Sequence, residues 1–411
     1  MFFQLKTVDE ILKIIEGFEP LEQEEVTLDS ALGRVTARDL VSREDLPGFA
    51  RSSMDGFAVR ARDTFGATES LPVLLEIAGA VAMGTLPEQP LGPGEAIRIA
   101  TGGMLPGDAD AVVMVEYSHL LDEATVEISR AASPLENVIQ PDDDVRKGDV
   151  CLPGGLRLRP QDVGVLAGLG LVVVPVVRRP RVAVLSTGDE VVPAETDPGP
   201  GQVRDINSHT LAAFSRSLGA DPLLLGLTPD SFESLRAQVE RGLREADTVW
   251  VSGGSSVGTR DLTVKVMESL PGMEILAHGV SISPGKPTIL ARAGSKTVWG
   301  LPGHAASALV VAEVFLVPFL RRLSGETPGR RSFSGSVKAV LTRNIESAPG
   351  RDDYMRVRLS DEDGRLTAEP LFGKSGLISP LAQADGLVLV DRFTEGLYQG
   401  QTVEVMLFRA G

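Results

Sequence analysis

The feature that most constrains the fold is an alternation of two kinds of segment between Arg179 and Arg330. Short apolar runs of strand length alternate there with longer segments that have the periodicity of an amphipathic helix. This alternation predicts a mainly parallel sheet with helices on both faces. Ligands bind such sheets beyond the carboxyl ends of the strands, so the loops at those ends are the first candidates for a site. The expected strands cover 181–190, 248–254 and 297–301, and the expected helices cover 208–220, 230–243, 261–270 and 305–323.

The segments on either side of this region have a different texture. The N-terminal segment reads as helical, because Thr7 and Glu10 have the spacing of a capping box and a second periodic segment lies near 28–40. Between 46 and 146, short β-type runs are separated by Gly and Pro, and a helical pattern then returns. The last 80 or so residues return to short strands. We therefore expect a multidomain α/β and β protein with four parts: a discontinuous helical domain (1–45 and 147–178), an inserted β-rich domain (46–146), the α/β domain (179–330) and a C-terminal β-barrel-like domain (331–411).

Composition excludes several classes of partner. The formal net charge of the 411-residue chain is −16, which argues against nucleic acid, because phosphate backbones are bound by basic patches. A small anionic ligand is still allowed, since a local nest of N–H groups or a bound metal can override the overall charge. The apolar runs are too short to cross a membrane, and the N-terminus lacks the layout of a signal peptide. The single cysteine, Cys151, cannot form an intramolecular disulfide and fits a cytoplasmic location; we expect it to be a buried, unreactive thiol.

Four loops at expected strand ends or helix starts carry residues suited to a phosphorylated ligand. Glycine- and serine-rich backbone can bind phosphate through its N–H groups, a lysine supplies positive charge, and carboxylates hold a divalent cation. Magnesium fits best, and a metal between them would let a carboxylate lie beside a phosphate. Each loop alone also has a purely structural interpretation, as a turn, a helix start or a solvated lysine, but four together favour one anion site. The loops are "STGDE" with Asp189 and Glu190, "VRDINS" with Asp205 and Asn207, "SGGSSVG" before Asp261, and "SPGKP" and "LPGH" with Lys286 and His304.

The β-rich region holds further candidates. Asp55 lies in a turn of small residues, "RSSMDGFAVR", and Thr101 lies beside paired glycines. Taken alone, both motifs are equally typical of ordinary β-turns. The charged run 140–149, which contains Asp144, is typical of a solvated loop.

Six motifs, in this order, give the chain a resemblance to a known family. They are "SSMDGFAVR", "RIATGGMLPGDADAVVMVE", "STGDE", "VSGGSSVGTRD", "SPGKP" and "GLPGH". In these motifs the sequence resembles the molybdopterin molybdenumtransferases, the MoeA family, which also includes the E domain of eukaryotic gephyrin. The resemblance covers essentially the whole chain. It implies an enzyme that takes adenylylated molybdopterin and molybdate, inserts molybdenum into the dithiolene and releases AMP, with Mg²⁺ required.

The resemblance also implies roles for individual residues. Asp205, Glu190 and Asp261 correspond to acidic residues that bind or position the metal and the pyrophosphate. Residues implied in phosphate binding are Gly253, Gly254, Ser255 and Ser256, and those implied in holding the oxyanion are Lys286, Pro302, Arg351 and Ser375. Functional residues of the first two domains match Asp55, Thr101 and Asp144. In this family those domains reach the site of the partner subunit, which implies a homodimer; molybdopterin adenylyltransferase and apo-molybdoenzymes are further expected partners.

The chain departs from the family pattern at three places. Ser283 stands where a second lysine is common, His304 and Ala305 replace the Asn and Pro of a PGNP motif, and Arg260 and Leu262 flank Asp261. These changes bear on oxyanion affinity and on the choice between molybdate and tungstate. Two alternatives stay open at this point: a molybdopterin adenylyltransferase, against which the extra domains count, and a non-catalytic scaffold, against which the retained Asp205, Asp261 and Lys286 count.

Overall fold

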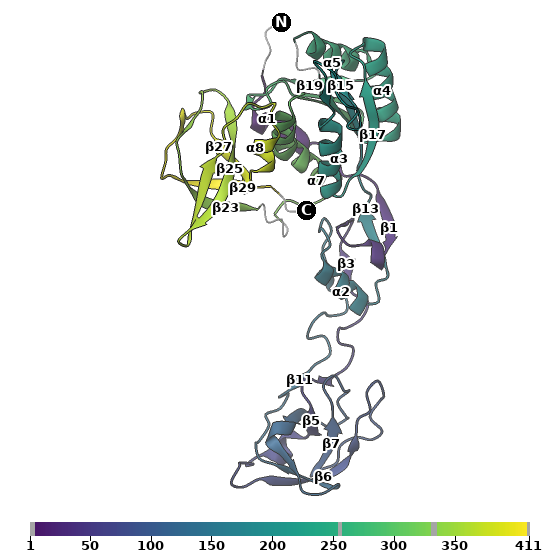
Figure 1. The fold of residues 1–411 in the computed structure, drawn as a ribbon. Helices are drawn as coiled ribbons and strands as arrows, with labels where there is room; N and C mark the ends of the chain where they lie inside the picture. The colour runs from purple at the N-terminus through teal and green to yellow at the C-terminus, as the bar shows by residue number, and fades with distance from the viewer. Residues whose placement is uncertain (1–4, 254–256, 330–334, 409–411) are drawn as a thin grey trace. The chain divides into compact units, whose positions relative to one another are not determined.

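The computed structural model describes residues 5–253, 257–329 and 335–408, and its backbone forms two compact units (Figure 1). Unit 1 comprises Met1–Arg38, Gly154–Arg159 and Val173–Gly411, and unit 2 comprises Asp39–Pro153 and Pro160–Val172. Within the described residues, no helix has both the length and the apolar content needed to cross a membrane. The four domain boundaries expected from the sequence remain a prediction.

Unit 1 is built on a six-stranded sheet of order β17-β14-β18-β22-β21-β19. The first four strands are parallel to one another, and β21 pairs antiparallel with both β22 and β19, which confirms a mainly parallel sheet. The strands are β14 (Arg181–Thr187), β17 (Asp221–Thr228), β18 (Thr248–Gly253), β19 (Glu274–His278), β21 (Ile289–Ala293) and β22 (Lys296–Leu301). The carboxyl ends of β14 and β18 lie in register at Thr187 and Gly253.

Helices cover both faces of this sheet because successive strand residues are apolar on both sides. Val182 and Val184 of β14 belong to one core with Trp250 and Trp299, whereas Ala183 and Leu185 point into the other core. The first face is covered by α1 (Val8–Glu16), α3 (Asn207–Ser217), α6 (Ala305–Val311), a π-helical turn (Ala312–Leu316) and α7 (Val317–Leu323); the second is covered by α4 (Phe232–Glu245) and α5 (Val257–Ser269).

The C-terminal part of unit 1 is a closed barrel, as expected from its short strands. Five strands follow one another in the order β25-β26-β23-β29-β27, and pairing between β25 and β27 closes the ring. Their bounds are β23 (Ser336–Leu341), β25 (Asp352–Glu362), β26 (Arg365–Pro370), β27 (Gly386–Val390) and β29 (Thr402–Leu407). Strand β20 (Ile282–Ser283) pairs with β25 and joins the barrel to the α/β sheet. Smaller elements here are β15 (Val191–Val192), β16 (Val203–Arg204), β24 (Ile345–Glu346), β28 (Gly396–Leu397) and α8 (Ser379–Ala382).

The helix expected near 28–40 is wrong. Apart from a single 3-10 turn, Leu28–Ser30, this stretch contributes strand β2 to a small sheet of order β1-β13-β2, and β1 comes just before it. The strands are β1 (Gln23–Thr27), β2 (Val35–Thr36) and β13 (Val173–Val177). Pairing with the valine-rich β13, far away in sequence, outweighs a local periodicity that also fits a helix.

Unit 2 contains the β-rich region and one helix. Its main sheet has the order β8-β5-β7-β6-β10-β9, and two short pairs, β11-β4 and β12-β3, accompany it. The strands are β3 (Leu40–Val41), β4 (Arg51–Ser52), β5 (Gly56–Val59), β6 (Val73–Ala80), β7 (Glu95–Ile99), β8 (Ala111–Met114), β9 (Ser118–Leu120), β10 (Thr125–Ile128), β11 (Val138–Ile139) and β12 (Val150–Leu152). The helix expected near residue 160 is confirmed as α2 (Pro160–Gly168), and 3-10 turns lie at Ala61–Thr64 and Val115–Tyr117.

Candidate functional site

Two of the hollows in unit 1 contain residues that the sequence predicted for the site. The smaller one, here the acidic hollow, has a volume of about 310 Å³ and lies at the carboxyl ends of β14 and β18. This is where the parallel-sheet rule places ligand sites. It brings together the predicted residues Glu190, Asp205 and Gly253 with Asn207, His304 and Gly376.

Asp205 is held rigidly at the start of α3. Its carboxylate is buried, with 8% of the residue exposed. Oδ1 accepts hydrogen bonds from Ser186 Oγ (2.9 Å) and from the Ser208 backbone N–H (3.0 Å). Asp205 therefore binds the first turn of α3 and connects it to the end of β14. Oδ2 has no hydrogen-bond partner among the described residues. Glu190 is exposed, and its carboxylate also forms no hydrogen bond within the described part of the chain.

Asn207 has a role that the sequence did not assign. Its Nδ2 donates to Ser252 Oγ (2.6 Å) at the end of β18 and to the Gly303 carbonyl (2.8 Å) after β22. One amide therefore joins three of the loops at the strand ends. In the sequence, its place two residues after Asp205 marks Asn207 as a candidate site residue. Its role in joining loops could not be predicted, because its partners lie 45 and 96 residues away in the chain.

Gly253 lines the acidic hollow, and the packing of β18 against β14 also requires a glycine at this position. Its φ is +140°, and a Cβ there would lie 2.0 Å from the Thr187 carbonyl oxygen. Part of the predicted phosphate loop lies outside the described residues, namely Gly254, Ser255 and Ser256, and the side chains of Arg260 and Asp261 are also outside the description. The structure thus places Gly253 at one end of this loop, and the roles of Gly254, Ser255, Ser256 and Asp261 stay predictions.

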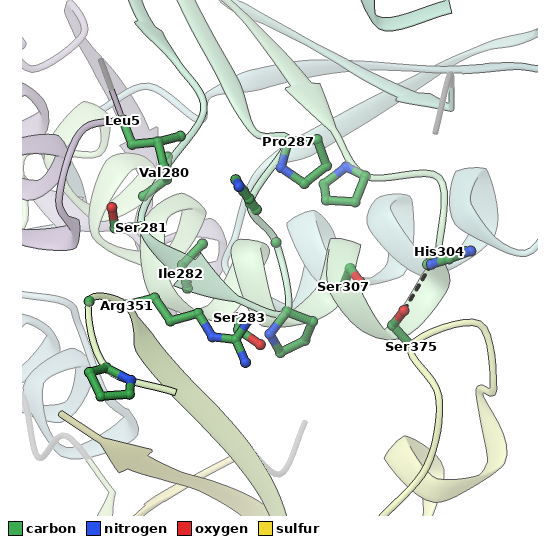
Figure 2. A pocket seen from close by; sticks show the side chains of 16 residues that line it. Leu5, Val280, Ser281, Ile282, Ser283, Pro287, His304, Ser307, Arg351 and Ser375 are labelled. Carbon is green, nitrogen blue, oxygen red and sulfur yellow. Dashed lines mark hydrogen bonds between the residues drawn. The ribbon is translucent and has the colours of Figure 1, made fainter. Parts of the chain in front are cut away.

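The larger hollow, here the basic hollow, has a volume of about 700 Å³ and is shown in Figure 2. None of the described residues that line it is acidic, although the chain as a whole carries a net charge of −16. Its polar groups instead suit an anion, since they are cationic side chains, hydroxyls and an imidazole. It brings together the predicted residues Lys286, Pro302, Arg351 and Ser375, with His304 and Ser307 beside them.

Two features of the backbone bring Lys286 and Arg351 to one cavity. Gly285 (φ +129°) lets the lysine loop lie against α6, because a Cβ there would be 2.5 Å from Val311 Cγ2. Ser283 pairs with Asp353 in the parallel β20–β25 register, which places the start of β25 beside the same loop. Arg351 Nε lies 3.2 Å from Asp353 Oδ1, which orients the guanidinium while the side chain stays 46% exposed. Lys286 is exposed as well.

His304 and Ser375 connect the α/β part to the barrel at this hollow. His304 Nδ1 lies 2.8 Å from Ser375 Oγ, the contact drawn as a dashed line in Figure 2. These residues are 71 positions apart in sequence. His304, which stands where the family commonly has Asn, therefore connects two parts of the candidate site.

The remaining predicted residues lie in unit 2. Asp55 Oδ1 accepts hydrogen bonds from the Thr101 backbone N–H (2.6 Å) and from Thr101 Oγ1 (2.8 Å). These bonds, the backbone one first, lower the pKa of the exposed Asp55 carboxyl below its usual value. The structure thus brings Asp55 and Thr101 together. Asp144 lies in an exposed turn, where its backbone N–H donates to the Leu46 carbonyl (3.1 Å); within the described part of the chain it forms no hydrogen bond with Asp55 or Thr101.

Comparison with known proteins matches three consecutive regions of the chain. Residues 6–170 match the MoeA N-terminal region (domain I and II), 183–322 match a probable molybdopterin binding domain, and 338–408 match the MoeA C-terminal region (domain IV).

Relatives match over nearly the full length. The molybdopterin molybdenumtransferase of Bacillus subtilis is 33% identical over 98% of this chain and 94% of its own. A putative molybdopterin biosynthesis protein of Methanocaldococcus jannaschii is 34% identical over 94% of this chain and 92% of its own. A solved structure of the molybdopterin biosynthesis MoeA protein of Pyrococcus horikoshii superposes with a TM-score of 0.83 at 36% identity, covering 99% of this chain and 100% of that one. The chain therefore belongs to the molybdopterin molybdenumtransferase (MoeA) family.

Proposed function

We propose that this protein inserts molybdenum into adenylylated molybdopterin and releases AMP, as a cytoplasmic enzyme. The observation that carries the proposal is the pair of adjoining hollows in unit 1. The acidic hollow has carboxylates at the carboxyl ends of parallel strands. The basic hollow has the cationic side chains of Lys286 and Arg351, and none of its described lining residues is acidic. A reaction between a phosphorylated ligand and an oxyanion needs both environments side by side.

The basic hollow suits molybdate as substrate. Molybdate is a tetrahedral dianion, and Lys286 and Arg351 together offset two negative charges. The hydroxyls of Ser307 and Ser375 line the same cavity and can donate to the oxyanion. Arg351 is already oriented by Asp353, so little side-chain entropy is lost when it binds.

The acidic hollow fits Mg²⁺ bound together with phosphate. Within the described residues, no group of three or more His, Cys, Asp or Glu side chains could hold a metal. Magnesium, however, is commonly held by one or two carboxylates plus substrate phosphate and water, and Asp205 Oδ2 and Glu190 are both without hydrogen bonds there. When bound, the ion would neutralise charge on the phosphoanhydride.

The protein's own groups position the reactants. Asn207 fixes the loops after β18 and β22 against the start of α3, which keeps the acidic hollow in shape. The β20–β25 pairing does the same for Lys286 and Arg351. One set is held by the Asn207 side chain and the other by backbone pairing, both within one unit, so the two ligands can meet in one fixed geometry, which lowers the barrier to their reaction.

We further propose that the protein works as a homodimer in which Asp55, Thr101 and Asp144 of each chain serve the site of the partner chain. The support is the family membership together with the paired geometry of Asp55 and Thr101 on unit 2. Molybdopterin adenylyltransferase as the supplier, and apo-molybdoenzymes as the recipients, are the further partners that this role requires.

The test is an insertion assay with purified protein, adenylylated molybdopterin, Mg²⁺ and molybdate. We expect AMP release and a product that activates an apo-molybdoenzyme. Asp205→Asn should lower the rate about 100-fold, because the amide oxygen can still cap α3 but carries no charge for the metal. The matched control is Asp230→Asn, a carboxylate that accepts from Thr187 Oγ1 at the same sheet edge but does not line the hollow. If the wild-type protein releases no AMP, the proposed function is wrong.

A further inference from the structure

His304 is the one described residue that lines both hollows. Two consecutive residues opposite His304 face different hollows, since Ser375 lines the basic hollow and Gly376 lines the acidic hollow. The boundary between the two cavities is therefore formed by the His304 ring on one side and by Ser375 and Gly376 on the other. A ligand that occupies both hollows has to pass this boundary.

The His304 ring is anchored by one nitrogen and available at the other. Nδ1 is 2.8 Å from Ser375 Oγ, whereas Nε2 has no hydrogen-bond partner among the described residues. The absence of a side chain at Gly376 keeps this edge open, because a Cβ there would lie 3.7 Å from Cδ2 and 3.9 Å from Nε2. The ring as a whole is exposed to solvent.

The Ser375 contact also decides what the free nitrogen can do. When the serine hydroxyl donates to Nδ1, the neutral ring carries its proton on Nε2 and is a donor there. In the imidazolium form both nitrogens are donors. In a third form the neutral ring donates Nδ1–H to Ser375 Oγ and Nε2 only accepts, but a negatively charged oxygen at the boundary selects one of the two forms that carry Nε2–H.

We propose that His304 is a substrate-positioning residue whose Nε2–H donates a hydrogen bond to the phosphoanhydride of adenylylated molybdopterin where the substrate passes from the acidic to the basic hollow. This inference rests on the proposed function. If the nucleotide end lies beside Asp205 and Gly253 while the dithiolene meets the oxyanion beside Lys286, the two linked phosphates must lie at the boundary. The phosphates carry the charge that best matches an N–H donor.

Two substitutions separate this role from a structural one. The amide nitrogen of Asn lies near the place of imidazole Nδ1, and that of Gln lies near the place of Nε2. His304→Gln thus keeps a donor towards the substrate, whereas His304→Asn keeps only the contact with Ser375. His304→Ala removes both, and His209→Ala, on the exposed side of α3, is the matched control.

The experiment measures kcat/KM for AMP release and, separately, the binding of AMP alone and of molybdate alone by calorimetry. We expect His304→Ala and His304→Asn to lower kcat/KM at least about tenfold, and His304→Gln to recover it to within about threefold of wild type. The affinity for molybdate should change less than about threefold in all variants, because molybdate occupies the basic hollow only. AMP carries one of the two phosphates that lie at the boundary, so its affinity should fall in His304→Ala and His304→Asn and recover in His304→Gln. His209→Ala should behave as wild type.

Three results would overturn the inference: unchanged kcat/KM in His304→Ala, recovery by Asn but not by Gln, or a loss of molybdate affinity as large as the loss of kcat/KM. The second result would assign His304 to holding Ser375, and the third to maintaining the shape of a hollow. A wild-type protein that releases no AMP would instead contradict the proposed function, so the two failures are distinguishable.

Discussion

Gly253 ends β18 opposite Thr187, at a point where the backbones of two parallel strands leave no space for a side chain. A glycine-rich strand end predicts a phosphate loop when only the sequence is known. The structure adds a second cause, since β14 and β18 could not keep their register with a larger residue here. Packing and binding therefore require the same residue type at this position, and only measurement of both properties separates them.

We expect Gly253→Ala to destabilise unit 1 by about 3 kcal/mol, the sum of a strained φ and a clash with the Thr187 carbonyl. Both tryptophans of the chain, Trp250 and Trp299, are buried in the sheet of this unit, so their fluorescence during urea unfolding reports on it. Gly272→Ala is the matched control, because its φ is +69° but a Cβ there meets nothing within 4 Å. That variant should lose only about 1 kcal/mol. Equal losses for both variants would contradict the packing argument.

Cys151 should react slowly with thiol reagents in the folded protein. It is half-buried in β12, its Sγ donates to the Leu40 carbonyl at 3.1 Å, and burial raises the pKa of the thiol. A raised pKa leaves less thiolate at neutral pH, and the thiolate is the reactive form. Since the chain has a single cysteine, reaction with a disulfide reagent at pH 7 should be at least about tenfold slower in buffer than in denaturant. Equal rates would show that the thiol is accessible.

The sequence predicted which residues meet in each hollow better than how they are held. Glu190, Asp205 and Gly253 meet in one hollow, and Lys286, Pro302, Arg351 and Ser375 meet in the other. Strand ends of a parallel sheet converge, so their loops could be grouped from the pattern alone. The bonds from Asn207 and His304 could not, because each joins segments tens of residues apart and depends on where the loops finally lie.

At the scale of elements, the strand–helix alternation predicts the α/β sheet correctly, whereas the helix predicted near 28–40 is wrong. Its apolar residues fit a helical period, but β1 and β2 form on either side of β13. A long-range pairing partner is invisible to a local pattern. The same holds for α1, whose capping box and apolar face were readable, but whose packing against Phe319 through Phe18 was not.

An ion pair fastens the small β1-β13-β2 sheet to the main sheet. Arg178, after β13, makes two hydrogen bonds of 2.7 Å to Asp247, before β18, and a third to Glu22. Burial alone would raise the pKa of Asp247, but the bonds from Arg178 and from the Arg181 N–H favour the charged form, and the net shift is downward. A lowered carboxyl pKa means that this stabilisation is complete above the ordinary value of 3.8 and is lost as the pH falls below it.

We expect Asp247→Asn to destabilise unit 1 by about 2 kcal/mol between pH 5 and pH 8. The difference from wild type should shrink as the pH drops below 3.8, because the unfolded chain then binds a proton at Asp247 that the folded protein, with its lowered pKa, does not yet bind. Tryptophan-detected urea unfolding at pH 7, 5 and 3.5 measures it. Asp221→Asn, which removes an exposed 3.7 Å pair with Arg179, should change stability by less than about 0.5 kcal/mol. A difference that grows towards acid pH would reverse the assigned sign.

At the scale of the whole molecule, the predicted site residues are divided between two compact units. Asp205 and Lys286 belong to unit 1, whereas Asp55 and Thr101 belong to unit 2. Unit 2 is inserted in the chain of unit 1, so one chain always carries both sets. If unit 2 of one chain completes the site of the other, a dimer contains two sites, and each is built from both chains.

This arrangement predicts complementation between inactive variants. When Asp55→Ala and Asp205→Asn proteins are unfolded, mixed in equal amounts and refolded, half of the dimers should be hybrids in which one of the two sites has both intact residues. Activity should then return to about a quarter of the wild-type value, because half of the dimers have half of their sites. Mixing Asp205→Asn with Lys286→Ala is the control: both changes lie in unit 1, so every site built on either chain is defective and no activity should return. No recovery in the first mixture would mean that each chain builds its site alone. Recovery in the control would mean that Asp205 and Lys286 do not serve one site.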